Sequence, residues 1–509
     1  MTKMEDPGGQ EKFLQQFCAD KVFLSGDKEW RVGKNFFLVK STVEKMVKWA
    51  CESSSRLYPE APVLVGSYTE QLHLQAEGSS NGFDFLVPLR YNPKLTLVSG
   101  STVAQDASSD CERKLPTYMF RDKGVPVVRW GTKVLLDLEA LGETYVEVHC
   151  DKKKEEEDEE DIVLDRLDEF KESLGHHNLD PVQITKDFHH YMEITLDPAY
   201  THPLQNDPVF QRRLFPSRVP RIDERIRKNI KLEALDSDSP AVQLTFDEGI
   251  ETVPVNLAPA IQGAFQLSNQ WVREDLTHLS DWWEGDLANE KKSFLRKAAV
   301  LQEVGPELVA KGGFWRLSFS RAEAAILEGV DADQGHRRAA LRLLKFVNVT
   351  RWMPEYGKIL TSYHLKTILL WCCEIYPQKA QWGTLLSSLQ ALLGILKHTL
   401  ARQKLPHYFL VPVNLFNRRY KSSSATYRPL ALEVLRLEVE AMLADPVGYL
   451  LPDHESQGRC VSEDFEEKWE ALRDFKGRRQ EELKKMEDEQ MYEEVEMYEG
   501  DGAESCVKS

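Results

Sequence analysis

The spacing of apolar residues changes once along this chain, close to residue 286. Before that point, short runs such as FDFLVPL (83–89) are typical of strands, and residues 239–262 alternate like two strands joined by a turn. A longer amphipathic pattern at 35–58 predicts a helix. After residue 286 the apolar residues recur every three or four positions, as in helices. These helical segments are 319–329, 336–348, 361–376, 383–403 and 430–444.

The sequence therefore predicts an α+β protein with a mixed α/β lobe followed by an all-helical lobe. With 509 residues, 42% of them hydrophobic, the chain can bury a large core in two or three domains. We divide it into an N-terminal segment, an α/β lobe with an acidic insertion near 151–172, a helical lobe, and a charged helix running into an acidic disordered tail. Their bounds are 1–28, 29–285, 286–450 and 451–509.

Charge and cysteine content narrow the class of protein. The chain has no run of eighteen apolar residues and begins without the apolar core of a signal peptide, so we expect a cytoplasmic or nuclear protein with no transmembrane segment. Its eight cysteines contain no CxxC pair, which gives a cysteine-rich zinc site no support. The net charge of −17 disfavours non-specific binding to nucleic acid.

One short constellation has the outline of a phosphoryl-transfer site. The turn GSY (66–68) precedes the strand that carries Asp84. A Gly-Ser turn offers backbone N–H groups and a hydroxyl to phosphates, and carboxylates on adjacent strands can hold two Mg²⁺ ions roughly 4 Å apart. By itself this pattern is weak, because a turn entering a strand is common.

Several further motifs, in order along the chain, resemble the Mab-21 family, which includes cyclic GMP-AMP synthase. The resemblance covers roughly 30–100 and 235–445. It implies a nucleotidyltransferase fold: a twisted mixed sheet with a spine helix, packed on a helical lobe with a cleft between them. The motifs are GGFWRLSFSRAEAAIL (312–327), SYHLKTILLW (362–371), PQKAQW (377–382) and LPHYFLVPVNLF (405–416).

The resemblance also locates three acidic metal ligands, two of which this chain lacks. Gly82 and Asn256 occupy two of the acid positions, and Asp84 is the retained acid, hence the only expected catalytic and metal-binding carboxylate. One carboxylate cannot neutralise two divalent ions beside a triphosphate. Mg²⁺ or Mn²⁺ is expected only if nearby acids complete the site. The acids in question are Glu77, Asp247, Glu248 and Glu251.

The positions that the resemblance assigns to nucleotide binding keep suitable residue types. A tyrosine can stack on a base, and arginine or lysine can hold a phosphate. The alternative is that the same residues build the core of the helical lobe, with Arg316 paired to Glu323. The seven positions are Ser67, Arg316, Ser318, Glu323, Lys345, Ser362 and Tyr363.

The zinc ribbon of the DNA-sensing synthase has no counterpart here. The segment before RRAALRLLK (337–345) contains no cysteine, and His336 reads as a helix-start residue. We therefore expect no zinc and no recognition of double-stranded DNA, while RNA stays open because of modest basic clusters at 218–228 and 417–421.

Three functions remain. The first is a catalytically degenerate Mab-21 protein that acts as a nucleotide-binding or scaffold protein, with a nucleoside triphosphate as its expected ligand. For this protein the family resemblance implies a role in development or innate immunity. The second is an active synthase that makes a cyclic dinucleotide from ATP and GTP. The third is an interaction protein whose acidic tail binds a protein partner.

Overall fold

The structure is a computed structural model. It describes residues 6–24, 26–53, 61–74, 82–89, 95–99, 117–122, 125–126, 145–149, 181–197, 224–235, 241–247, 252–262, 282–283, 294–311, 314–411, 413–417, 427–451 and 465–474. The acidic insertion predicted near 151–172 and the acidic tail beyond 474 lie outside these ranges.

A mixed sheet forms the α/β half, and eleven strands of the described chain belong to it in the order β1-β2-β9-β10-β11-β6-β4-β3, with β5 beside β4 and β7-β8 beside β9. The central pair, β2 and β9, is parallel, whereas β9 pairs antiparallel with β8 and β10. The strands are β1 Val63–Val65, β2 Phe83–Leu89, β3 Leu95–Ser99, β4 Thr117–Asp122, β5 Val125–Pro126, β6 Tyr145–His149, β7 Ile230–Leu232, β8 Val242–Asp247, β9 Thr252–Gln262, β10 Glu307–Lys311 and β11 Phe314–Ser318.

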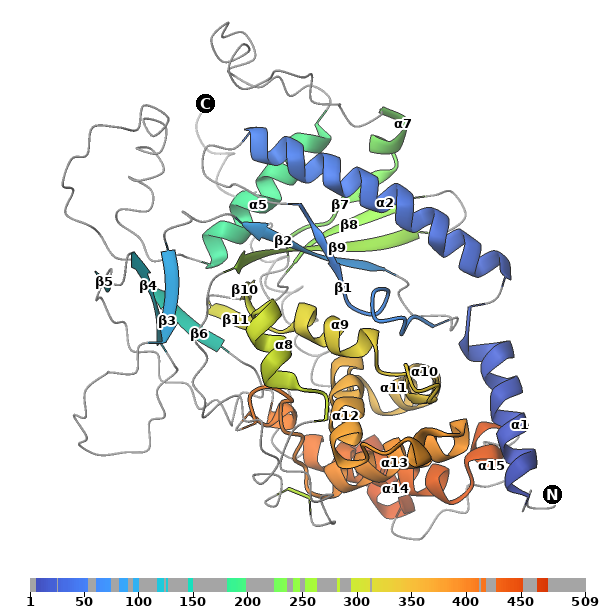
Figure 1. Ribbon diagram of the computed structural model, residues 1–509. Helices are drawn as coiled ribbons and strands as arrows, with labels where there is room; N and C mark the ends of the chain where they lie inside the picture. The colour runs from blue at the N-terminus through green and yellow to red at the C-terminus, as the bar shows by residue number, and fades with distance from the viewer. Residues whose placement is uncertain are drawn as a thin grey trace, which may run out of the picture.

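Two long helices, α2 (Gly26–Ser53) and α5 (Pro181–Leu196), lie over one face of this sheet (Figure 1). Val43 and Met46 of α2 and Phe188 of α5 are 0% exposed and pack against strand residues such as Phe83 and Val255. The apolar periodicity that predicted a helix at 35–58 is this buried stripe. The helix itself begins nine residues earlier than predicted, at Gly26.

The helical half is built from amphipathic and fully buried helices. All five helices predicted from periodicity are confirmed: they correspond to α9, α10, α12, α13 and α14. The described helices of this half are α8 Lys297–Val304, α9 Ser320–Glu328, α10 Arg337–Val347, α11 Met353–Tyr356, α12 Ser362–Ile375, α13 Leu385–Ala401, α14 Tyr427–Ala444 and α15 Pro446–Leu450; two short ones, α1 Pro7–Phe17 and α7 Glu224–Arg227, come earlier in the chain.

The N-terminal segment belongs to the helical half. Helix α1 lies beside α13 and α15 (Figure 1), and Leu14, Cys18 and Val22 are 0% exposed in the same core as those helices. Both carboxylate oxygens of Glu11 accept hydrogen bonds from the backbone of Leu385 and Leu386, the first residues of α13, at 2.9 and 2.8 Å. The chain thus starts in the helical half and crosses to the sheet at α2.

Two expectations need correction. The segment after residue 286 is not all helical, because β10 and β11 extend the sheet and pair with β9 and β6. The charged helix near the end, described at 465–474, is exposed over most of its length as expected, but one face docks on the core: Phe465 and Leu472 are 6% and 0% exposed, and the Trp469 ring packs edge-on against Tyr356 at 5.2 Å. In the described part of the chain, no helix combines the length and apolarity needed to cross a membrane.

Candidate functional site

The turn after β1 and the strand β2 form the core of the candidate site. Gly66 has φ +78°, a conformation that favours glycine, and it directs the chain so that Ser67 follows at the edge of the sheet. On β2, Asp84 lies opposite Val65 of β1 and opposite Asn256 of β9. Two of the three acid positions implied by the resemblance therefore are neighbours across two strands, as the sequence predicted.

Asp84 already has a partner, and that partner is a donor. The side-chain amide of Asn256 donates a hydrogen bond to Asp84 Oδ1 at 2.7 Å. Burial raises the pKa of Asp84, while the Asn256 hydrogen bond and the charge of Lys366 act in the opposite direction. A metal ion needs oxygen lone pairs on both sides of the site. Here an N–H group points at the carboxylate.

The third acid position has no room for a side chain. A Cβ atom on Gly82 would come within 2.6 Å of the backbone oxygen of Pro254 and 3.0 Å of its side chain. Real Cβ atoms do not approach a backbone oxygen so closely, so an aspartate at this position would require the strand β9 to move. The backbone geometry around Gly82 therefore leaves no space for an acidic side chain at this position.

The nearby acids do not complete the site within the described chain. Asp247 is exposed at the end of β8 and lies opposite Thr252, four residues along β9 from Asn256, a separation of roughly 13 Å. Glu77, Glu248 and Glu251 are outside the described ranges. Among the residues that the structure describes, no group of three or more His, Cys, Asp or Glu side chains is placed to hold a metal ion. Within the described chain, the three acid positions of the resemblance supply one carboxylate, that of Asp84.

Lys345 reaches from α10 to the β1–β2 turn, which we define as residues 66–74. Its Nζ donates to Ser67 Oγ at 3.1 Å and to the backbone oxygen of Leu72 at 2.8 Å. Burial lowers the pKa of Lys345 to about 8, with Glu70 acting in the opposite direction. Two predicted nucleotide-binding residues, Ser67 and Lys345, are thus in direct contact.

A second lysine, which sequence reasoning missed, connects the same turn to α12. Lys366 Nζ lies 2.8 Å from Glu70 Oε1 and also forms an ion pair with Glu323 of α9. Burial alone would lower the pKa of Lys366, but Glu323 and Glu70 raise it above its usual value. Lys366 follows Tyr363 by three residues on α12, so helical spacing could have suggested it. Nothing in the sequence points to Glu70.

Tyr363 is held by the interior of the helical half. Its hydroxyl lies 2.8 Å from His407 Nε2. Burial, with Arg316 and Lys297 nearby, lowers the pKa of His407 to about 3, and its Nδ1 accepts from two backbone N–H groups. The neutral ring therefore donates from Nε2 to the tyrosine oxygen. Burial and the carboxylate of Glu323 raise the pKa of Tyr363.

The remaining predicted residues are less closely associated. Arg316 lies on β11, and its Nε is buried without a hydrogen-bond partner. The charge of Arg316 acts on Tyr363, which places it near that ring, whereas Glu323 forms an ion pair with Lys366. Ser318 lies 3.0 Å from Ser320, oxygen to oxygen, and Ser362 is exposed at the start of α12. The cluster therefore contains Asp84, Ser67, Lys345, Glu323, Tyr363 and Arg316.

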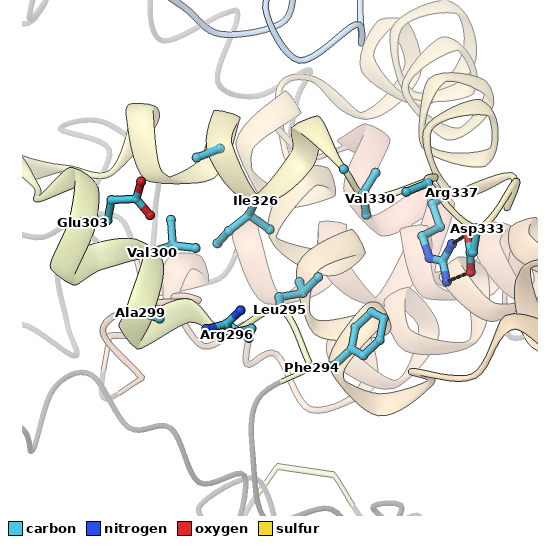
Figure 2. A pocket seen from close by; sticks show the side chains of 13 residues that line it. Phe294, Leu295, Arg296, Ala299, Val300, Glu303, Ile326, Val330, Asp333 and Arg337 are labelled. Atoms are coloured by element: carbon cyan, nitrogen blue, oxygen red, sulfur yellow. Dashed lines mark hydrogen bonds and ion pairs between the residues drawn. The ribbon is translucent and has the colours of Figure 1, made fainter.

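A separate pocket of about 430 Å³ lies beside α8 and α9 (Figure 2). Apolar side chains such as Val300 and Ile326 line it, and the Asp333–Arg337 ion pair closes one end, with Nη1 and Oδ1 2.6 Å apart. None of the predicted site residues lines this pocket. His336, expected to start a helix, is the N-terminal cap residue of α10, and its N–H donates to the oxygen of Trp382 at 3.0 Å.

The comparisons with known proteins agree with this architecture. The Mab-21 protein nucleotidyltransferase domain matches residues 149–329, and the Mab-21 protein HhH/H2TH-like domain matches 336–429. Together these two matches cover more than half of the chain. It belongs to the Mab-21 family. A nucleotidyltransferase domain with a mixed sheet is thus followed by a helical C-terminal domain. Ser67 and Asp84 precede the matched segment but lie on or beside the same sheet.

The curated relatives that the chain matches are Mab-21-like proteins. It is 29% identical over 187 residues to "Protein mab-21-like 3" of Danio rerio, covering 36% of this chain and 45% of that one. It is 26% identical over 249 residues to "Protein mab-21-like 3" of Xenopus laevis, covering 47% of this chain and 64% of that one. It is 31% identical over 194 residues to "Protein mab-21-like" of Drosophila melanogaster, covering 36% of this chain and 50% of that one. The chain spans about half the length of these relatives.

Proposed function

We propose that this chain is a catalytically inactive Mab-21 protein, a scaffold of the nucleotidyltransferase type. The observation that carries the proposal is the hydrogen bond from Asn256 to Asp84, 2.7 Å long. It occupies an acceptor site on Oδ1 of the retained acid and brings a partial positive charge to the place where a metal ion would be. The lack of space at Gly82 supports the same conclusion.

In this proposal, residues that would contact a triphosphate instead join the two lobes. Lys345 and Lys366 both bind the β1–β2 turn from helices of the helical half. Leu72 and Leu74 of that turn are 1% and 3% exposed in the helical core. The turn is thereby fixed between the halves, and the scaffold presents one rigid arrangement to its partners.

A second activity, metal-independent nucleotide binding at the cleft between the lobes, has separate support. The ammonium group of Lys345 is buried and makes its direct contacts with neutral oxygens of Ser67 and Leu72 rather than with a carboxylate. The carboxylates of Glu70 and Asp84 act on this charge without a direct hydrogen bond to it, and burial still lowers the pKa of Lys345. A buried charge is costly, and a bound anion in direct contact would offset part of that cost. The phosphates of a nucleoside triphosphate supply such an anion, with the buried Arg316 Nε as a further donor.

The test is incubation of the full chain with ATP, GTP and Mg²⁺ or Mn²⁺, with and without double-stranded RNA. We expect no cyclic dinucleotide. Formation of a product that disappears in Asp84→Ala would establish the rival function, an active synthase. Without metal, we expect ATP or GTP to raise the melting temperature by a few degrees, since saturation at 100-fold over Kd contributes about 2.7 kcal/mol.

Two variants separate the two proposed activities. Lys345→Met is expected to abolish the nucleotide-dependent rise in melting temperature, whereas Lys358→Met, at an exposed loop position, is expected to keep it. If the parent chain shows neither product nor stabilisation, nucleotide binding is rejected and the scaffold function alone remains.

A further inference from the structure

The outer face of α2 carries large aromatic side chains that the fold leaves uncovered. Trp30 and Phe37 are 67% and 72% exposed, although the opposite face of the same helix is buried on the sheet. At about 100° per residue, Trp30, Lys34, Phe37 and Lys48 fall along one narrow line. We call Trp30, Gly33, Lys34, Phe37 and Lys48 the outer stripe; α2 runs along the outside of the molecule (Figure 1).

Gly33 in this stripe has no internal explanation. A glycine within a helix costs about 1 kcal/mol relative to alanine. A Cβ atom on Gly33 would meet nothing within 4 Å, so no neighbour in the structure requires a bare backbone there. It leaves a notch between Trp30 and Phe37. These two residues are seven positions apart, which corresponds to about 10 Å along the helix axis. A notch flanked by aromatics allows close approach of another chain.

The stripe is basic in an acidic protein. Lys34 and Lys48 are exposed, and Lys34 Nζ lies 5.8 Å from the centre of the Trp30 ring. One exposed acid, Glu44, falls on the same line and lies 3.9 Å from Lys40. The whole chain has a net charge of −17. An occupant of this surface must therefore be acidic and must supply apolar side chains at helical spacing.

We propose that the occupant is the C-terminal segment 487–500 of this same chain. Its sequence, EDEQMYEEVEMYEG, contains seven acids and no lysine or arginine. Met491, Val495 and Tyr498 follow the i, i+4, i+7 spacing of a helix face. Met491 and Tyr498 are seven residues apart, the same interval that separates Trp30 from Phe37. Charge and apolar spacing are both complementary.

The chain is long enough for this contact. The described part of the chain ends at residue 474, and twelve residues, 475–486, separate it from the proposed segment. When extended, twelve residues span about 40 Å. The radius of gyration expected for a folded chain of this length is about 23 Å. The connection can therefore span more than one radius of gyration of the folded chain.

The surface is less suited to nucleic acid. Phosphate binding draws on many clustered lysines and arginines, whereas the stripe carries two lysines, Lys34 and Lys48. The seven-residue interval and the notch correspond to helix-against-helix packing, not to the spacing of phosphates.

The experiment uses the full chain with Glu493, Glu494, Glu496 and Glu499 changed to glutamine, which frees the stripe of its own tail. A fluorescent peptide of residues 486–502 is titrated by anisotropy. We expect this variant to bind the peptide at least tenfold more tightly than the parent chain, in which the tail competes. We also expect Trp30→Ala/Phe37→Ala, made in the same background, to weaken peptide binding at least tenfold.

Gly33→Ala gives the sharpest readout, because it should stabilise the fold and weaken the contact. We expect a higher melting temperature together with a loss of peptide binding of tenfold or more. The matched control is Gly394→Ala: Gly394 is also inside a helix, α13, with nothing within 4 Å of a Cβ, and should raise the melting temperature without changing peptide binding.

Three outcomes overturn the proposal: equal peptide binding by the parent and the glutamine variant, unchanged binding by Gly33→Ala, or no loss on removing both aromatics. Stripe-dependent binding of an RNA oligonucleotide or of anionic phosphatidylserine vesicles, with no binding of the peptide, likewise rejects it in favour of that other ligand.

Discussion

At the scale of single residues, Asn256 decides the chemistry of the candidate site. An amide and a carboxylate on neighbouring parallel strands can satisfy one another without a metal ion, because one donates and the other accepts. Asp84 is half-buried, and its pKa is raised by burial and lowered again by Asn256. The pair is therefore a structural hydrogen bond between the neighbouring strands β2 and β9.

The pair can be tested by restoring the acid. Asn256→Asp places two carboxylates in contact on β2 and β9, and we expect it to lower the free energy of unfolding at pH 7 by about 1–3 kcal/mol. The repulsion raises the pKa of the pair in the folded state, so the loss is present at neutral pH and shrinks as the pH falls through that range. Denaturant unfolding at pH 7 and pH 4 measures it.

The matched control is the exchanged pair, Asp84→Asn with Asn256→Asp. It restores one donor and one acceptor, and we expect stability close to that of the parent chain. Stabilisation of Asn256→Asp by millimolar Mg²⁺ would contradict our proposal that this backbone is unsuited to a metal ion.

The sequence predicted this residue set only in part. Asp84 and Asn256 were expected to be neighbours, and they are, because parallel strands align the residues that the resemblance marks. The roles of Lys366 and Glu70 were missed, since their contact joins residues 296 positions apart. Such a pairing depends on how the helices dock on the turn, which no local pattern encodes.

At the scale of elements, periodicity predicted the long helices and failed where packing overrides it. Helices α12 and α13 are recognisable from apolar spacing, and each begins at a threonine capping box, Thr361 and Thr384. Strands β10 and β11 were missed because their apolar runs resemble short buried helices. The docking of segment 465–474 on the core was missed because only two of its residues, Phe465 and Leu472, are buried.

Helix α1 gives a prediction at this scale. Glu11 accepts from the first two N–H groups of α13, which have no partner within the helix, and it places negative charge at the positive end of the helix dipole. We expect Glu11→Ala to lower the free energy of unfolding by about 1–2 kcal/mol, as measured by chemical denaturation.

Asp20 offers the comparison for Glu11. It is an exposed acid of the same N-terminal segment, and its carboxylate accepts hydrogen bonds from the exposed side chain of Gln16. We expect Asp20→Ala to change stability by less than about 0.5 kcal/mol. Equal effects of the two substitutions would mean that α1 does not cap α13 in solution.

At the scale of the whole molecule, the β1–β2 turn is the place where the sheet and the helices are joined. Three basic side chains of the helical half contact it: Arg342 donates to the oxygen of His73 at 3.1 Å, Lys345 reaches Ser67, and Lys366 reaches Glu70. The α/β half by itself could not bury this turn. The two halves should therefore unfold together, and the strength of their coupling should depend on the ion pairs in the turn.

Lys366 is the side chain with which to test that coupling. Lys366→Met leaves the carboxylates of Glu70 and Glu323 buried without their cation, and removing one partner of a buried ion pair costs about 3–5 kcal/mol. We expect calorimetry to show one transition for the parent chain, and for Lys366→Met a lower and broader transition in which the halves separate. The triple variant Glu70→Gln, Glu323→Gln, Lys366→Met removes all three charges and should recover most of the loss, because neutral side chains of similar size need no counter-charge. Should Lys366→Met unfold in one transition at the parent's temperature, the turn would not be what couples the sheet to the helices, and the scaffold function would lose its structural basis.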